Sequence, residues 1–438
     1  MTQILRGVNN ALQSLFTFAK NIYKMKNKTL FFTLLNLYVS FTVFSQTENI
    51  ITPKNIKKHI SFLASDKLEG RGTSTKSELK AAKYIAKQFK KLGLKGAGTE
   101  GGYFHKFEYA KVTNPHGNDD PNMPKQKSQN VVGYLDNGAE YTIVVGAHYD
   151  HLGRGLDKNS LEANPEGKIH NGADDNASGT TGVLELARYF TKNGKKEPYN
   201  FLFMCFSGEE LGLLGSKKFI EYPSFDLSKI NYMLNMDMIG RFRDEKGLMV
   251  QGVGTSSLWV KMLEVLRPDF KIIQDSSGVG PSDYTSFYLK GIPVIGFFTG
   301  QHTDYHKPSD DVETINFEGE KKILDFAVRL IEGTCTFQKM DFQQTKQPQN
   351  QARSFKVTMG VMPDYAFDKK GMRIDGVTDG RPAAKAGLKT GDIILKIGDL
   401  DIENVYGYMD ALGKFKKGET TKVVIKRGSE DMTLDMTF

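Results

Sequence analysis

Acidic and imidazole side chains recur shortly after the apolar segments of this chain. Each of the segments TIVVGA, NFLFMCF, YMLNM and IPVIGFF is followed by His, Asp or Glu, and a further pair of acids lies in GADDNASG. Carboxylate oxygens and imidazole nitrogens together form a ligand set that suits zinc and also accepts cobalt or manganese. The residues that could do chemistry are therefore His148, Asp150, Asp175, Glu209, Glu210, Asp237 and His306.

Taken singly, each of these motifs has a simpler explanation. Asp174 and Asp175 could cap the helix that follows them, and Ser207 with Glu210 fits a capping box. His148 could be a hydrogen-bonded histidine of the core. The coincidence of all the motifs favours a metal site, because carboxylates crowded into one place repel each other unless a cation lies among them.

The order of the expected elements explains why these residues should meet. Strand-like segments at 130–135, 141–148, 199–207, 230–237 and 292–298 alternate with helix-like segments at 178–190, 210–220, 257–266 and 319–333. Helical periodicity also marks 54–95, and a turn-rich stretch then runs to 124. We expect an α/β fold with a central, mostly parallel (mixed) sheet and helices on both faces. Ligands of such sheets collect at the carboxyl ends of the strands, where the candidate residues stand.

The motifs GAHYDHLG, GADDNASG, FSGEELGLLGS, NMDMIGR and DYHKPSDD resemble, in order and spacing, those of the di-zinc exopeptidase family that includes secreted bacterial leucyl aminopeptidase. The resemblance covers residues 54–338. It implies two Zn²⁺ ions per subunit, for which Co²⁺ or Mn²⁺ could substitute. Asp175 would bridge the two ions, His148 and Asp237 would complete one, and Glu210 and His306 would complete the other.

The same resemblance implies how the remaining residues of these motifs act. Glu209 would be the general base and acid that serves a metal-activated water. Asp150 would accept the imidazole N–H of His148 and so fix its tautomer. The bond between Asp175 and Asn176 is expected to be cis, and the free α-amine of the substrate is expected near the second zinc.

Other polar residues near the motifs are candidates for the substrate pocket or are expected to have no chemical role. Ser282 and Asp283 occupy the place where members of the family shape the substrate pocket, and His302 is a candidate for lining it. His151, next to Asp150, is expected to face the other side of its strand, in packing or at the surface. The N-terminal segment Leu68-Glu69-Gly70-Arg71-Gly72 resembles a recurrent segment of the family and receives no chemical role.

The N-terminal 45 residues have the form of an extension and signal peptide. Lys26 and Lys28 precede an apolar run at 30–44, and cleavage is expected after Ser45. A short membrane anchor is the alternative, although the run is shorter than the ~20 residues of a spanning helix. We therefore expect an exported protein, periplasmic or extracellular, with no integral membrane domain after cleavage.

Charge argues against a nucleic-acid partner. The 438 residues include 59 Lys and Arg and 51 Asp and Glu, a net charge of +8. Five of the basic residues and none of the acidic ones lie in 1–45, so the remainder carries 54 basic and 51 acidic residues. A nucleic-acid-binding surface needs clustered basic residues, so no nucleic-acid partner is expected. Peptide substrates are what the resemblance to the exopeptidase family implies.

The peptidase domain is expected at 46–338, and a polar, Gln-rich linker at 339–354. Residues 355–438, with the segment DGRPAAKAGLKTGDIIL, resemble a PDZ domain of the kind attached to bacterial envelope proteases. PDZ domains bind peptides by adding a strand to a sheet edge, and Met359, Gly360 and Val361 stand near the usual carboxylate-binding loop. A module that merely braces the peptidase is the alternative.

The function that follows is an exported metallo-aminopeptidase that removes N-terminal residues from peptides. A carboxypeptidase or a glutaminyl cyclase of the same fold is the alternative. A non-catalytic adaptor is disfavoured, because Glu209 and the five expected ligands are all present.

Overall fold

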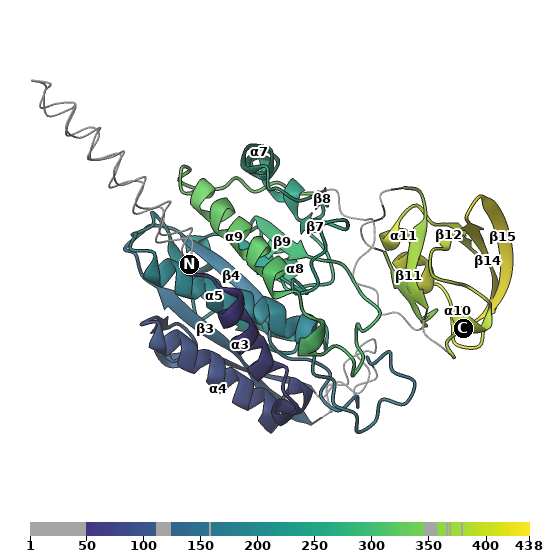
Figure 1. Ribbon diagram of the computed structural model, residues 1–438, viewed down its shortest axis with the longest axis horizontal. Coiled ribbons are helices and arrows are strands. Elements are labelled where there is room, and N and C mark those ends of the chain that lie inside the picture. The colour runs from purple at the N-terminus through teal and green to yellow at the C-terminus, as the bar shows by residue number, and fades with distance from the viewer. Residues whose placement is uncertain are drawn as a thin grey trace, which may run out of the picture. The chain divides into compact units, whose positions relative to one another are not determined.

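The computed structural model describes residues 50–110, 124–156, 159–345, 357–364, 367, 369–377 and 380–438. The predicted signal peptide lies outside the described residues, as does the predicted linker from residue 346 onward. Within the described part of the chain, no helix is both long and apolar enough to cross a membrane. Figure 1 shows the elements of two parts: the predicted peptidase domain with residues 340–345, called the peptidase part below, and the C-terminal part from residue 357 onward.

The peptidase part is built on a mixed nine-stranded sheet. The strand order is β1-β3-β5-β4-β6-β9-β7-β8, and β2 also pairs with β3. The pairs β5–β4, β4–β6 and β6–β9 are parallel, whereas β3 and β7 join this central block in antiparallel pairs. The strands are β1 (Lys95–Gly96), β2 (Phe104–Ala110), β3 (Lys125–Leu135), β4 (Thr142–His148), β5 (Asn200–Phe206), β6 (Ile230–Met236), β7 (Leu248–Gln251), β8 (Ile272–Gln274) and β9 (Val294–Phe298).

Helices cover both faces of this sheet, as its apolar strands require. On one face, α5 (Gly179–Lys192) packs on β4, β5 and β6 and contacts α3 (Pro53–Leu63), α4 (Lys76–Lys91) and α9 (Phe317–Thr334) (Figure 1). On the other, α6 (Leu214–Glu221) and α8 (Tyr284–Tyr288) bury Phe219 and Phe287 against strand residues such as Val144 and Met233. A further helix, α7 (Ser257–Leu266), contacts α9.

Two segments differ from the sequence-based expectation. Residues 104–110, expected within a turn-rich stretch, form β2, because His105, Phe107 and Tyr109 alternate inward along the strand. Residues 340–345, expected within the linker, contact the rest of the peptidase part. The backbone N–H of Met340 donates to Asn231, and the hydroxyl of Tyr288 accepts the backbone N–H of Thr345.

The C-terminal part has its own six-stranded sheet and its own apolar core. The sheet order is β10-β11-β12-β14-β15, with β13 paired to β12. Ile374, Ile394, Val423 and Ile425 are among the buried residues of this core. Its elements are β10 (Val361–Pro363), β11 (Met372–Val377), α10 (Pro382–Lys385), β12 (Ile393–Ile397), β13 (Leu400–Asp401), α11 (Val405–Leu412), β14 (Thr420–Arg427) and β15 (Glu430–Thr437).

Candidate metal centre

Three neighbouring strands deliver site residues to one edge of the sheet. His148 is the last residue of β4, and Asp237 directly follows β6. Glu209 and Glu210 follow β5 after a turn at Gly208, whose φ of 68° favours glycine. Because β5, β4 and β6 are parallel, their carboxyl ends lie together.

Asp175 reaches the same place from a tight turn at Ala173–Ser178, just before α5. The carboxylate of Asp310 holds this turn, since it accepts the backbone N–H of Asp174 at 3.1 Å and that of Asp175 at 3.0 Å. The bond between Asp175 and Asn176 is cis, as expected. Asp175 is 3% exposed, so its carboxylate is buried within the cluster.

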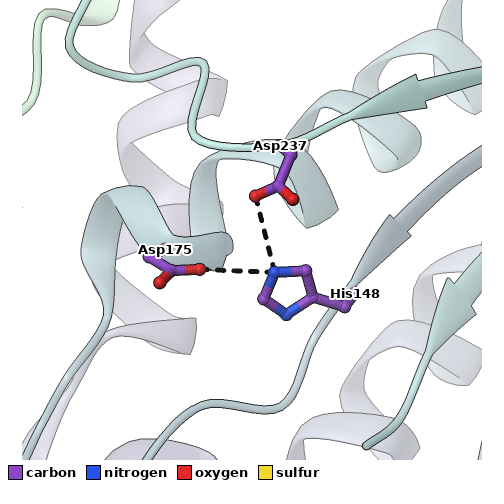
Figure 2. A group of neighbouring side chains, drawn as sticks. All are labelled: His148, Asp175 and Asp237. Atoms are coloured by element: carbon purple, nitrogen blue, oxygen red, sulfur yellow. Dashed lines mark ion pairs between the residues drawn. The ribbon is translucent and has the colours of Figure 1, made fainter. Parts of the chain in front are cut away.

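The first group of donor atoms consists of Nε2 of His148 and one carboxylate oxygen each of Asp175 and Asp237 (Figure 2). This nitrogen lies 3.3 Å from Oδ1 of Asp175 and 3.5 Å from Oδ1 of Asp237. Two donors that bind one tetrahedral zinc at about 2.0–2.1 Å lie roughly 3.3 Å apart. The three residues therefore have the spacing of ligands to one ion, and they form one of two clusters able to hold a metal among the described residues.

The second group lies on the other oxygen of Asp175. Nε2 of His306 is 3.3 Å from Oδ2 of Asp175 and 3.0 Å from Oε2 of Glu210. Each oxygen of Asp175 thus faces a different histidine, which is the arrangement of a bridging carboxylate. His306 follows β9 on a loop and has a φ of 55°.

Both imidazoles have the free nitrogen that a metal ligand needs. Nδ1 of His148 lies 3.2 Å from the backbone oxygen of Asp150, and Nδ1 of His306 lies 2.9 Å from that of Asn159. A proton on each Nδ1 satisfies these carbonyls and leaves Nε2 unprotonated toward the carboxylates. Nε2 of His306 is buried and has no hydrogen-bond partner among the described residues. The residues fit zinc.

The electrostatics of the cluster also favour a bound cation. Burial opposes ionisation of the His148 ring, yet Glu209 and Asp237 outweigh it and raise the pKa of His148 well above its usual value. Burial likewise opposes ionisation of Glu210, but His306 and His151 lower its pKa to about 2. The carboxylates thus hold positive charge strongly, as a metal site does.

Glu209 differs from its neighbours in position and in proton affinity. Its Oε2 is 3.9 Å from Nε2 of His148, farther than the oxygens of Asp175 and Asp237. Burial, with Asp237 and Glu210, raises the pKa of Glu209 well above its usual value. A carboxylate with a raised pKa beside a metal cluster suits a group that takes and returns a proton.

Asp150 supports the site through more than one contact. The Nδ1 of His148 is nearer to the backbone oxygen of Asp150, at 3.2 Å, than to its carboxylate Oδ1, at 3.7 Å. The carboxylate accepts the hydroxyl of Thr73 at 2.8 Å and the backbone N–H of Glu209 at 3.1 Å. It thereby links the loops after β4 and β5.

The three residues expected at the substrate pocket occupy different places. Ser282 lines a pocket beside the donor cluster and donates its hydroxyl to Oδ2 of Asp237 at 2.7 Å. It therefore contacts an expected metal ligand directly. Asp283 is fully buried, and burial raises its pKa to about 7. His302 is also buried, with Nε2 3.2 Å from Oδ2 of Asp174, on the residue before the bridging carboxylate.

Two buried residues that the sequence left without a role brace the site. Arg71 is fully buried, and its guanidinium donates to the carbonyls of Leu63, Tyr149, Asn171 and Gly172. It therefore ties the loop after β4 to the turn that carries Asp175. Burial lowers its pKa to about 10. A charged residue between two glycines was the available signal, but its partners are distant in sequence.

Glu78 is the second. It lies on α4 and is 1% exposed. Its carboxyl group accepts the hydroxyls of Ser128 and Ser207 and the backbone N–H of Ser74. Burial raises its pKa to about 8. Since Ser207 begins the loop that carries Glu209, this network supports that loop.

In the C-terminal part, the three residues expected at a peptide-binding loop are consecutive and precede or begin β10. Met359 is fully buried, and its carbonyl accepts the backbone N–H of Ala383. Gly360 has a φ of 74°, and a Cβ there would lie 2.2 Å from Cβ of Arg381. Val361 starts β10, which pairs antiparallel with β11.

The fold and the donor cluster define a metal-dependent hydrolase on a mixed α/β sheet. Residues 130–331 match peptidase family M28, and residues 346–437 match the PDZ domain. The chain thus has a segment similar to M28 peptidases and a C-terminal segment similar to PDZ domains.

Individual relatives agree with this assignment. A probable leucine aminopeptidase of Arthroderma otae is 25% identical over 293 residues, which are 63% of this chain and 72% of the relative. Aminopeptidase YwaD of Bacillus subtilis is 31% identical over 207 residues, 44% of this chain and 42% of the relative. The structure of BSAP, a zinc aminopeptidase from Bacillus subtilis, has a TM-score of 0.51 at 19% identity and covers 68% of this chain and 99% of that chain. That likeness is one of fold.

Proposed function

We propose that this protein is an exported aminopeptidase that binds two zinc ions and removes N-terminal residues from peptides. The observation that carries the proposal is the split of the Asp175 carboxylate between two histidines. One oxygen lies 3.3 Å from His148 and the other 3.3 Å from His306. Asp237 and Glu210 add one carboxylate to each group.

Each residue of the site has a separate role in the proposed reaction. His148, Asp175 and Asp237 would hold one ion, and Asp175, Glu210 and His306 the other. Bound zinc supplies Lewis acidity, which acidifies water and polarises a carbonyl. Glu209 accepts the proton of the attacking water and returns it to the leaving amine. Ser282, through its hydrogen bond to Asp237, keeps that carboxylate in place.

The pocket beside the cluster supports an amine-binding rather than a carboxylate-binding site. The described peptidase residues that line it include Asp175, Glu209, Glu210 and Asp237. None of these peptidase residues is Lys or Arg. Arg241 is not among the lining residues and is paired with Asp304 at 2.8 Å. Negative groups suit the α-ammonium of a peptide N-terminus, and a carboxypeptidase needs a cation for the substrate carboxylate.

A kinetic screen tests the proposal. The purified zinc-loaded protein is assayed on a short peptide with a free N-terminus, on its N-acetylated form and on its C-amidated form. Loss of a charge-assisted contact costs about 1.5–3 kcal/mol, and misplacing the scissile carbonyl adds to this cost. We expect acetylation to lower kcat/KM at least ~100-fold, at 1.36 kcal/mol for each tenfold, and amidation to change it little.

The same screen separates the alternatives. If amidation rather than acetylation stops cleavage, the enzyme is a carboxypeptidase. If a peptide with N-terminal Gln is cyclised and no peptide is hydrolysed, it is a glutaminyl cyclase.

We also propose that the PDZ domain binds a peptide or protein ligand by strand addition near Met359–Val361. The support is the match of residues 346–437 to the PDZ domain and the glycine turn before β10. Titration of peptides with free and amidated C-termini tests it. Affinity that is unaffected by amidation excludes carboxylate capture, and no binding to either series rejects the proposal.

Export is part of the proposal and depends on residues 25–45 alone, with their basic start and apolar run. Fractionation of expressing cells tests it, with the N-terminus of the exported protein sequenced. A protein that begins at Gln46 fits the proposal, and one retained in the cytoplasm with its leader contradicts it.

A further inference from the structure

His151 is buried inside the cluster, which differs from its expected place on the far side of a strand. It is 1% exposed, and its Nδ1 lies 2.7 Å from Oε1 of Glu210. The reason is that β4 ends at His148, so the alternation of a strand no longer applies three residues later. Instead, the backbone at His151 makes an isolated bridge with Gly72 and turns the ring inward.

The contact divides the two oxygens of Glu210 between two histidines. Oε1 faces His151, whereas Oε2 lies 3.0 Å from Nε2 of His306 in the second donor group. A hydrogen bond to one oxygen of a carboxylate favours the orientation in which the other oxygen faces the metal ion. His151 thus sets both the rotation of the carboxylate and the number of oxygens that it offers.

The geometry distinguishes this role from direct ligation. His151, Asp175 and Glu210 lie close enough together to hold a metal. However, the 2.7 Å between Nδ1 and Oε1 is a hydrogen-bond distance, shorter than the roughly 3.3 Å that separates two donors on one tetrahedral zinc. Nδ1 is also 3.8 Å from Oδ2 of Asp175, whereas Nε2 of His306 is 3.3 Å from the same oxygen.

Packing fixes the ring of His151 in this orientation. A Cβ at Gly172 would lie 2.5 Å from Cγ and Cδ2 of the ring, so only glycine allows the ring to rest there. On another side the ring of His306 meets it edge-on, with the centroids 5.8 Å apart. Nε2 of His151 is buried and has no hydrogen-bond partner among the described residues. The polar contact of the ring is therefore the one to Glu210.

We propose that His151 is a positioning residue that donates its Nδ1 proton to Oε1 of Glu210 and thereby presents Oε2 to the second metal ion. This inference depends on the proposed two-zinc function. Hydrogen bonds that orient a metal ligand typically change metal affinity by about 10–100-fold when they are removed. The effect falls on the ion held by Glu210 and His306, because the first group shares only Asp175 with it.

The test compares His151→Ala with His151→Asn, whose amide N–H stands close to the place of Nδ1. The control is His59→Ala, which removes a buried histidine of α3 whose partners are Tyr84 and Glu185. Zinc affinity and stoichiometry are measured by chelator competition, and the absorption spectrum is recorded with Co²⁺ in place of zinc. Thermal unfolding of each metal-free protein checks folding.

We expect His151→Ala to weaken one of two zinc sites about 10–100-fold, with the other unchanged. His151→Asn should recover most of the affinity, and His59→Ala should bind both ions normally. The Co²⁺ spectrum of the Asn variant should match that of the unchanged protein, because the ligand set is the same. If His151→Ala does not fold, the Asn variant and its spectrum still decide the question.

Two results overturn the inference. Equal zinc affinity in His151→Ala and the unchanged protein would show that the ring does not position Glu210. Loss of one site in both variants, with an altered Co²⁺ spectrum, would make His151 a ligand. Failure of the proposed function is seen separately, in the unchanged protein, as binding of fewer than two ions or as no cleavage of peptides with a free N-terminus.

Discussion

Replacing Glu209 by Gln should stop catalysis and leave the metal site intact. The change keeps the size of the side chain and removes its ability to take a proton. Oε2 of Glu209 lies 3.9 Å from Nε2 of His148, so the group stands next to the ligands, whereas Asp175 and Asp237 lie at 3.3 and 3.5 Å. Its backbone N–H, which donates to Asp150, is unaffected.

The expected loss follows from the role of the carboxylate. A positioned general acid or base contributes about 10²–10⁴-fold, which is about 2.7–5.4 kcal/mol at 1.36 kcal/mol for each tenfold. In the proposed mechanism Glu209 serves two proton transfers, and burial raises its pKa as such a role requires. We therefore expect kcat to fall by at least ~10³-fold, toward the upper end of that range, with little change in KM.

The assay measures kcat and zinc content on the same sample, with Glu210→Gln as the matched control. The neighbouring residue carries the same carboxylate, but its Oε2 lies 3.0 Å from Nε2 of His306, so its loss should remove one ion. Near-normal turnover by Glu209→Gln would refute its assignment as the base. Loss of zinc from that variant would instead make Glu209 a ligand.

Three other changes test separate parts of the structure. Removing residues 346–438 should leave a folded enzyme that is active on short chromogenic peptides. The deletion keeps residues 340–345, which contact the rest of the peptidase part. A soluble, zinc-loaded but inactive product would contradict this prediction. Glu78→Gln should flatten the pH dependence of thermal stability between about pH 4.5 and 8, because the folded carboxyl, with a pKa of about 8, retains a proton that the unfolded chain releases above 4.5. The unchanged protein should lose up to about 1.4 kcal/mol per pH unit as pH rises through that window, and parallel stability curves for the two proteins would reject the reasoning. Ser282→Ala should weaken zinc binding about tenfold through Asp237, and unaltered affinity in chelator competition would refute it.

The sequence predicted the part of the site that local patterns specify. His148 ends an apolar strand, Asp237 directly follows one, and Glu210 lies in the loop after a third. The carboxyl ends of parallel strands bring such residues together whatever the details of the loops. The helices α5, α7 and α9 were also expected, since their apolar residues recur at helical spacing.

Contacts between distant segments could not be predicted in this way. The partners of Arg71 lie up to 101 residues away, so periodicity carries no information about them. His151 was expected on the wrong side because the alternation of a strand was extended to a residue beyond the end of the strand at His148. In β2, the alternation of FHKFEYA was present but lay among turn residues.

The contacts of Arg71 and Glu78 bear on how the enzyme can be divided. The family match begins at residue 130, yet a fragment cut there would lack the guanidinium that joins Tyr149 to Gly172 and the carboxyl group beneath Ser207. The smallest autonomous catalytic unit should therefore be longer at its N-terminus than the segment that matches the family. Transplanting or recombining this domain should keep α3, α4 and the segment between them with the sheet, because Arg71 and Glu78 brace the candidate metal centre from positions before residue 130.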